Sequence, residues 1–210
     1  MIEVFSCGPV ATNALVVYCA QTKDAAIIDP SLDSASHITA CIEKHALKPT
    51  KILLTHSHWD HIADLKELAQ KYSLDVYVHT HDAPNVEHPG SDGLTSPVFI
   101  AGFKPSHMIG EGDIIKVGTI ALKVIETPGH TPGGVCFYIE KEHLLISGDT
   151  LFKGSYGRLD LPQAKKEPMI ASLKKLSKLP ADTVVIPGHG PQTSIEKESW
   201  IQHPEKRLNS

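Results

Sequence analysis

The sequence predicts a mixed α+β and α/β protein built as a four-layered αββα sandwich, in which two sheets face each other and helices cover their outer faces. Two successive halves of the chain each place short apolar strands before amphipathic helices. In the first half, the strand predicted at residues 51–55 is apolar throughout its middle, which is typical of a strand covered on both faces. With 210 residues, the chain is expected to form one domain over residues 1–210.

The first half is expected to begin with a β-hairpin, because two runs rich in Val and Ile flank a polar turn. An amphipathic helix follows, then a strand, a helix that starts just past His61, and another strand, which together form a βαβ unit. Pro30 is expected to hold Asp29 in an extended conformation at the end of the hairpin. The hairpin strands, first helix and two later strands are predicted at residues 13–19, 25–28, 34–47, 51–55 and 76–78.

Residues 80–107 contain recurring proline and glycine, which break any helical or strand period. This segment is expected to form a long loop or a partly structured cap, and loops of this length are often functional.

The second half resumes with two strand pairs, a helix with Pro168 in its first turn, and a last strand. The run Thr193-Ser194-Ile195-Glu196 has the form of a capping box before a final short helix. The strands and the main helix are predicted at residues 114–117, 120–127, 135–139, 144–147, 168–176 and 183–186.

The charge balance and the cysteine pattern limit the class of protein. A net charge of -4 provides no broad basic surface for a phosphate backbone, so nucleic acid is not expected as a partner. No apolar run approaches the roughly 20 residues of a membrane span, and residues 1–9 have no basic leader. The four cysteines show no paired spacing, which favours reduced thiols. We therefore expect a cytoplasmic protein without a membrane partner, and the sequence leaves the oligomeric state open.

Metal-binding side chains are concentrated in the run THSHWDH at residues 55–61, directly after an apolar strand. Three later strands also end in glycine or proline beside one histidine or aspartate, in TPGHTPG (127–133), SGDT (147–150) and PGHG (187–190). Ligands gather at the C-terminal ends of strands in such sheets, so we expect these side chains to converge. The candidate ligands are His56, His58, Asp60, His61, His130, Asp149 and His189.

The number of candidate ligands indicates two metal ions. Zinc prefers about four or five nitrogen and oxygen donors, so this set exceeds the needs of one ion and implies two ions that share a carboxylate. Two ions about 3.5 to 4 Å apart can hold a bridging hydroxide, which is typical of a hydrolytic site.

The sequence resembles the metallo-β-lactamase superfamily, whose HxHxDH signature is met by His56, His58, Asp60 and His61. The resemblance covers almost the whole chain and implies the αββα fold. It also implies one ion on His56, His58 and His130, a second ion on Asp60, His61 and His189, and Asp149 as a bridge between them.

The same resemblance implies further roles around the two ions. Asp60 and Asp149 would support catalysis by a metal-bridging hydroxide, and Asp29 would orient histidines from behind the ligands. We expect two zinc ions, with iron or manganese as alternatives at either site.

Within the superfamily, the sequence is most similar to the short single-domain form of glyoxalase II, the hydroxyacylglutathione hydrolase. The similarity lies in GDTLFKGS at residues 148–155 and GRLDLP at residues 157–162. It implies hydrolysis of a small-molecule thioester of the hydroxyacyl-glutathione type. Longer relatives have a C-terminal helical domain that contacts glutathione, and this chain is expected to lack it. Gly190-Pro191 stands where they have Glu-Tyr, and Asp160 stands where they have tyrosine.

Other functions remain open from the sequence. Persulfide dioxygenases look similar and use a single iron on the positions of His56, His130 and Asp149. A lactone or ester hydrolase could use the same ligands, whereas a non-catalytic metal-binding module would not need all of them.

The segment that follows Asp149 contains three candidates for substrate binding, which are Lys153, Tyr156 and Arg158. Trp59 is a further candidate for the pocket wall. His79 and His81 also form an HxH pair, but they lack the following Asp-His, so a structural role is expected for them.

Overall fold

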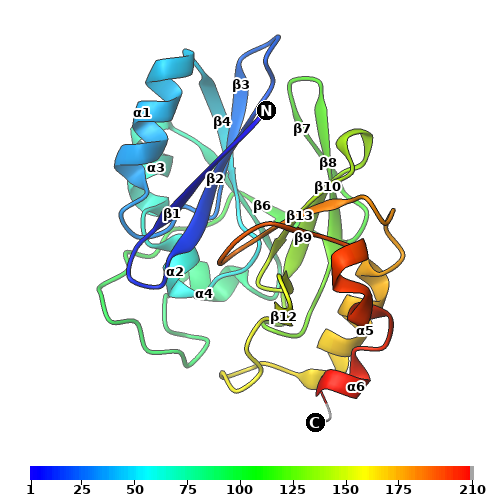
Figure 1. Cartoon of the computed structure of the whole chain (residues 1–210). Coiled ribbons are helices and arrows are strands. Elements are labelled where there is room, and N and C mark those ends of the chain that lie inside the picture. The colour runs from blue at the N-terminus through cyan, green and yellow to red at the C-terminus, as the bar shows by residue number, and fades with distance from the viewer. Residues whose placement is uncertain (209–210) are drawn as a thin grey trace.

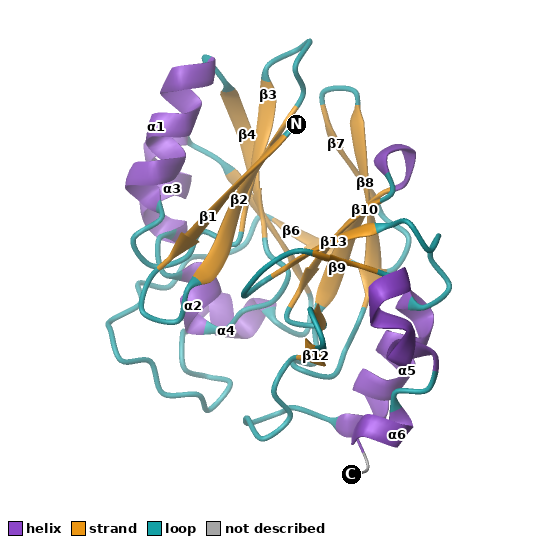
Figure 2. Ribbon diagram, in the orientation of Figure 1, coloured by secondary structure: helices purple, strands orange, loops and turns teal. Residues whose placement is uncertain are grey.

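Two six-stranded sheets pack face to face in the computed structural model, which describes residues 1–208 (Figure 1). Helices α1 (Ala35–His45) and α3 (Leu65–Tyr72) lie outside the first sheet, and α5 (Lys166–Leu176) and α6 (Glu205–Leu208) lie outside the second (Figure 2). This order of layers confirms the predicted αββα sandwich.

The first sheet contains the strands of the N-terminal half, which span Ile2–Cys7 (β1), Thr12–Tyr18 (β2), Asp24–Ile28 (β3), Lys48–Leu53 (β4), Asp75–His79 (β5) and His107–Ile109 (β6). They lie in the order β1-β2-β3-β4-β5-β6. The first three pair antiparallel, whereas β3 to β6 run parallel. Because β4 and β5 are parallel and joined through helices, they form the predicted βαβ unit.

The second sheet contains the strands Ile114–Val117 (β7), Ile120–Glu126 (β8), Val135–Ile139 (β9), Leu144–Gly148 (β10), Val184–Pro187 (β13) and Thr193–Ser194 (β14). They lie in the order β14-β13-β10-β9-β8-β7. A small hairpin of β11 (Leu151–Phe152) and β12 (Ser155–Tyr156) follows β10. Two 3-10 segments lie at Glu140–Glu142 (η1) and Glu196–Gln202 (η2), and the second is kinked at Glu198.

Three apolar clusters fill the spaces between the four layers. The first lies under α1 and α3, the second lies between the sheets, and the third lies under α5. Neighbouring residues of β2 belong to different clusters, since Val16 faces the first and Val17 faces the second. The strand is therefore buried on both faces, which explains its apolar sequence. Burying each such side chain contributes about 1.5 to 3 kcal/mol.

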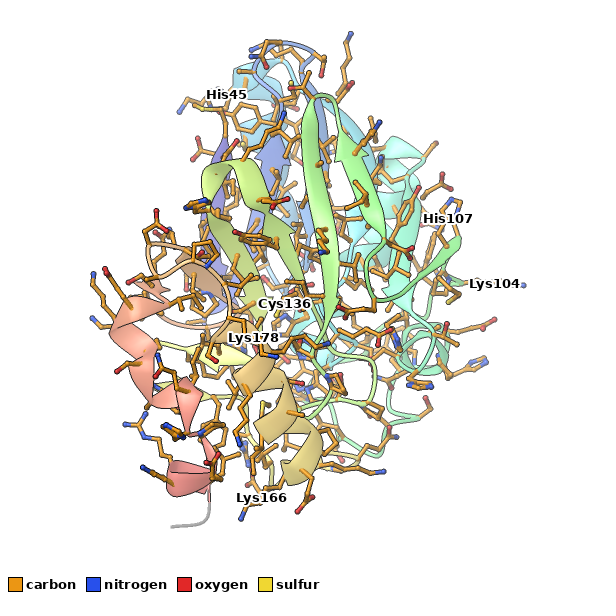
Figure 3. All side chains as sticks on the ribbon, turned by 90° about the vertical axis from the view of Figure 1, so that its right-hand side faces the viewer. His45, Lys104, His107, Cys136, Lys166 and Lys178 are labelled. Carbon is orange, nitrogen blue, oxygen red and sulfur yellow. The ribbon has the colours of Figure 1, made fainter. Side chains whose placement is uncertain are left out.

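The cysteines are free and buried in the described chain. Cys136 lies in the cluster under α5, in the middle of the molecule in Figure 3, whereas the labelled Lys104 and His107 project outward. Burial raises the pKa of the Cys136 thiol to about 11, so it packs as a small apolar side chain. Within residues 1–208, no helix has the length and apolar character needed to cross a bilayer.

The backbone at Asp29 differs from the prediction. Its φ is 49°, in the left-handed region, and not extended as Pro30 alone would favour. The Asp29 carboxylate accepts hydrogen bonds from Thr55 N at 2.8 Å, Thr55 Oγ1 at 2.6 Å and His61 Nδ1 at 3.0 Å. These bonds hold a conformation that costs roughly 1 to 2 kcal/mol, so tertiary contacts override the local preference.

The helix after the histidine cluster also begins earlier than predicted. The short helix α2 (Trp59–Ile62) already contains His61, and α3 begins separately at Leu65. Asp60 and His61 therefore lie on a helical turn and not on a loop. Their side chains are buried but polar, so the apolar period of the sequence does not reveal this turn.

The predicted capping box at Thr193 is wrong. Thr193 and Ser194 form strand β14, which pairs with β13. The Thr193 hydroxyl donates to Glu198 Oε1 at 2.6 Å, and the η2 segment that follows has no side-chain cap bond. The sequence also does not predict β1, because this edge strand has only one fully buried residue, Cys7.

Residues 80–107 are held by local contacts and by hydrogen bonds that Asp82 and Asn85 make with other loops. The segment contains helix α4 (Ala83–Glu87) and the first residue of β6, with irregular chain between them. Asn85 accepts from Gly90 N at 2.9 Å, so the side chain of α4 fixes the start of the irregular part.

Candidate metal centre

The candidate ligands come from strand ends that share one edge of the sandwich. Strands β8, β10 and β13 run in the same direction, because β8 and β10 are each antiparallel to β9 while β10 and β13 are parallel. The loops after them carry His130, Asp149 and His189, and the loop and helical turn after β4 carry the four ligands of the HxHxDH motif. The chain topology thus brings together residues up to 133 positions apart, from His56 to His189.

The first group of candidate ligands contains His56, His58 and His130, whose ring nitrogens lie within 4.8 Å of one another. His58 Nδ1 is 2.9 Å from His130 Nε2. All three side chains are buried. This is the set that the sequence analysis assigned to the first ion.

The second group contains Asp60, His61 and His189, again with donor atoms within 4.8 Å of one another. His189 Nε2 is 3.2 Å from Asp60 Oδ2 and 3.3 Å from His61 Nε2. The Thr12 hydroxyl donates to Asp60 Oδ2 at 2.8 Å and fixes that carboxylate.

Asp149 lies between the two groups. Its Oδ2 is 3.4 Å from His130 Nε2 of the first group and 3.4 Å from His189 Nε2 of the second. Its Oδ1 is 3.5 Å from His61 Nε2. This position suits a carboxylate that binds two ions at once.

Close packing around Asp149 depends on Gly188. A β-carbon at position 188 would overlap Asp149 Oδ1 and would also crowd the His61 ring. Glycine therefore lets the backbone after β13 approach the proposed bridging carboxylate.

Hydrogen bonds at the rear of the rings fix which nitrogen faces the centre. His130 Nδ1 is 2.9 Å from the Arg158 carbonyl oxygen, and His189 Nδ1 is 3.0 Å from the Val10 carbonyl oxygen. Because a carbonyl oxygen only accepts, both Nδ1 atoms carry the proton, and the Nε2 lone pairs point inward. His61 Nδ1 lies against Asp29 Oδ2 in the same way.

His56 is oriented through Thr55. The Thr55 hydroxyl donates to Asp29 Oδ2, so it accepts from His56 Nδ1 at 3.1 Å. His56 Nε2 then offers its lone pair to the centre, where this atom is buried without a hydrogen-bond partner among the described residues. One carboxylate, Asp29, therefore positions two of the candidate ligands.

These observations fit a metal centre. Buried polar atoms normally have hydrogen-bond partners, yet His56 Nε2 and Asp149 Oδ1 have no hydrogen bond within the described chain. Imidazole lone pairs and carboxylate oxygens converge on the same space, and rear hydrogen bonds of this kind accompany most metal-binding histidines. Imidazole and carboxylate donors suit zinc, iron and manganese.

The two groups differ in their electrostatics. Burial and the neighbouring histidines lower the pKa of His58 to about 3 and hold the pKa of His56 well below its usual range. Burial also disfavours the charged form of His61 and His189, but Asp60 and Asp149 outweigh it and raise their pKa to about 9 and about 10. A cation entering the second group would therefore displace protons from His61 and His189, whereas His56 and His58 already offer neutral rings.

Asp82 is a site residue that the sequence analysis missed. It is 2% exposed and accepts hydrogen bonds from Ser57 N at 2.8 Å and Gly133 N at 2.7 Å. It therefore ties the loop of His56 and His58 to the loop of His130. Asp82 follows β5 as Asp29 follows β3. A carboxylate shortly after a predicted strand is therefore the sequence signal that could have identified it.

A cavity of about 330 Å³ opens over the candidate ligands and will be called the metal cavity. Its walls include Val10, Trp59, Leu94, Phe152 and Leu161, and Arg158 also lines it. The Arg158 guanidinium pairs with Asp160 at 2.9 and 2.7 Å, and both side chains are largely exposed.

The other predicted substrate-binding residues lie elsewhere. Within the described chain, Lys153 and Tyr156 are not among the residues that line the metal cavity. Tyr156 packs beside Trp200, with ring centroids 6.0 Å apart, and Lys153 is exposed. Their role in substrate binding stays a prediction. His79 Nε2 lies 3.0 Å from Glu126 Oε1 and His79 Nδ1 accepts from His81 N, so both nitrogens of His79 have partners outside the candidate centre.

Comparison with known proteins places this geometry in a family. Residues 7–189 match the model of the metallo-beta-lactamase superfamily. A probable metallo-hydrolase of Bacillus subtilis is 35% identical over 91% of this chain and 90% of its own length. A hydroxyacylglutathione hydrolase of Haemophilus influenzae is 33% identical over 84% of each chain.

Solved structures agree with the sequence comparison. A crystal structure described as BLEG-1 B3 metallo-beta-lactamase superposes with a TM-score of 0.86 at 40% identity, over 94% of this chain and 96% of that one. A second protein, TTHA1623 in a di-iron-bound form, gives a TM-score of 0.81 at 36% identity with the same coverage of both chains. The chain therefore belongs to the metallo-beta-lactamase superfamily.

Proposed function

We propose that this chain, a metallo-hydrolase of the superfamily, binds two divalent ions and cleaves thioesters of small hydroxyacyl groups. The observation that carries the proposal is the division of the candidate ligands into two groups with Asp149 between them. A binding module without catalysis would need one closed site, whereas two adjacent ions are typical of hydrolysis.

Ions bound to these residues would supply activated water and a Lewis acid at the thioester carbonyl. The chain's own residues would hold and tune that chemistry. His56, His58 and His130 would hold the first ion, and Asp60, His61 and His189 the second, with Asp149 shared. Asp60 and Asp149 would offset the positive charge, and Asp29 would keep His56 and His61 in the tautomers that bind metal.

The walls of the metal cavity favour a small acyl group. Val10, Trp59 and Phe152 are close to the candidate ligands and would exclude bulk water from the reacting carbonyl. Arg158 would lie beside the entering substrate, although its pairing with Asp160 reduces its attraction for an anion.

The name of the Haemophilus influenzae relative supports S-lactoylglutathione, a hydroxyacylglutathione, as the first substrate to test. We propose zinc at both sites, and the di-iron form of the neighbour at 36% identity supports iron as the main alternative.

The test is hydrolysis by protein that is stripped of metal and then loaded with zinc, iron or manganese. We expect two metal equivalents per chain and turnover of S-lactoylglutathione or a related hydroxyacyl thioester, with no turnover by the stripped protein. The assay panel should include a lactone, a simple ester and a β-lactam, because the neighbour at 40% identity is described as a β-lactamase.

Three outcomes would contradict the proposal. Turnover of the lactone, ester or β-lactam in the absence of thioester hydrolysis would keep the hydrolase but replace its substrate class. One iron per chain with oxygen uptake on glutathione persulfide would make the protein a dioxygenase. Full metal occupancy without activity on any compound would leave a metal-stabilised binding module.

A further inference from the structure

A second cavity adjoins the metal cavity. It has a volume of about 400 Å³, lies beneath residues 89–100, and will be called the cap chamber. Trp59 and Leu94 line both cavities, so these two side chains form a wall that the cavities share. A substrate held at the candidate ligands could extend past these two side chains.

The cap chamber is fixed to the metal-binding loop by hydrogen bonds. Asn85 Nδ2 donates to the Ser57 carbonyl oxygen at 2.7 Å, between His56 and His58 in the sequence. The same amide donates to Asp92 Oδ2 at 3.0 Å, and Asp92 Oδ1 accepts from Leu94 N at 2.9 Å. These hydrogen bonds therefore fix the distance between the chamber wall and the candidate ligands.

The lining of the cap chamber carries one charged side chain, the Asp92 carboxylate, and has no lysine, arginine or histidine among its described residues. Its other polar side chains are neutral. Asn85 and Ser96 already hydrogen-bond within the chain, whereas the exposed Thr95 carries a hydroxyl that can donate to or accept from an amide group. Such a surface can hydrogen-bond amide groups. It offers no cation to a carboxylate, and Asp92 would repel one.

We propose that the cap chamber binds the thiol arm of the substrate and selects an uncharged, amide-bearing arm over the anionic arm of glutathione. This inference rests on the proposed hydrolysis of thioesters. With a small hydroxyacyl group in the metal cavity, the longer thiol arm would extend past Trp59 and Leu94, the two side chains that line both cavities. The chemical class of the substrate is then a hydroxyacyl thioester of a pantetheine-like thiol.

The experiment compares S-lactoylpantetheine with S-lactoylglutathione, which share the acyl group and differ in the charge of the thiol arm. For metal-loaded wild-type protein, we expect kcat/KM to favour the pantetheine thioester by about threefold to tenfold. Thr95→Lys adds a cation to the exposed rim of the chamber and should reduce or reverse this preference by raising kcat/KM for the glutathione thioester.

Two control variants separate charge from other effects. Thr95→Gln lengthens the same side chain without charge and should keep the wild-type preference. Gln70→Lys adds the same charge on the exposed face of α3, where Gln70 lines neither cavity, and should also keep it.

The results distinguish the inference from the proposed function. Hydrolysis of thioesters with equal preference, or with preference for the glutathione thioester in the wild-type protein, would overturn the inference and leave the proposed function intact. An unchanged preference in Thr95→Lys would also overturn it. Absence of hydrolysis of both thioesters by fully loaded protein would overturn the proposed function itself.

Discussion

The metal cavity and the cap chamber are built in different ways, although they share Trp59 and Leu94. The candidate ligands of the metal cavity come from both sheets, and most are buried and oriented by hydrogen bonds to groups far away in the sequence. The cap chamber is formed mainly by one irregular segment, residues 89–100, and several of its residues are exposed.

Under the proposed function, this difference separates chemistry from specificity. A ligand that is fixed from several strands cannot change without disturbing the fold, whereas a chamber wall on one surface segment tolerates substitution. Changes in the metal cavity should therefore remove metal and activity together, and changes in the cap chamber should alter substrate preference alone. The predictions below test this contrast, beginning with the largest expected effect.

Replacing Asp149 with alanine should have the largest effect, because this carboxylate contacts both ligand groups. We expect Asp149→Ala to lose the second metal equivalent and nearly all hydrolysis. Elemental analysis and turnover of the best thioester measure both effects. Asp75→Ala, at an exposed strand residue, is the matched control and should keep two equivalents. Normal metal content and turnover in Asp149→Ala would show that the assignment of Asp149 is wrong.

Gly188→Ala tests the close approach of the backbone to the centre. The added methyl group would occupy the position of Asp149 Oδ1, so this carboxylate has to move. We expect weaker binding of the second ion and a fall in kcat, with the fold retained. Metal titration monitored by calorimetry measures the affinity for the second ion. Gly154→Ala is the control, because a β-carbon there meets no atom within 4 Å, although its positive φ adds some strain. Equal metal affinity in both variants would contradict the role of Gly188.

Asp82→Ala should have an intermediate effect. It leaves the buried N–H groups of Ser57 and Gly133 without their partner, at a cost of about 1 to 3 kcal/mol each. Because the loops of His58 and His130 are then no longer tied together, we also expect metal affinity to fall about 10-fold to 100-fold. Asp82→Asn, which keeps one accepting oxygen, should recover part of the affinity. Loss of stability without any loss of metal affinity would show that Asp82 supports only the fold.

Phe99→Ala should have the smallest effect. Phe99 lines the cap chamber but is 92% exposed, so its removal should change the free energy of unfolding by less than about 0.5 kcal/mol. We expect a modest rise in KM for thioesters with a long thiol arm and no change in metal content. Steady-state kinetics with a long-arm thioester and a short methyl thioester give the comparison. An equal rise in KM for both thioesters would show that Phe99 does not contribute to binding of the thiol arm.

The sequence predicted most of the fold and all the candidate ligands, because both leave local signals. Buried strands such as β2 and β9 read as apolar runs, and each candidate ligand stands beside glycine or within two residues of another candidate ligand near a strand end. The sequence did not reveal the helical turn of Asp60 and His61 or the strand at Thr193, because polar side chains and a tertiary hydrogen bond replace the usual pattern there.

The sequence by itself determined the family, the layers of the sandwich and the candidate donor set of the metal centre with its expected division into two groups. Only the tertiary structure decided the left-handed backbone of Asp29, the clamp at Asp82 and the shape of the cap chamber. Each of these depends on contacts between residues far apart in the chain, such as the hydrogen bond between Asp82 and Gly133. Local periodicity and motif spacing carry no information about such contacts, so they emerge only when the two sheets pack together.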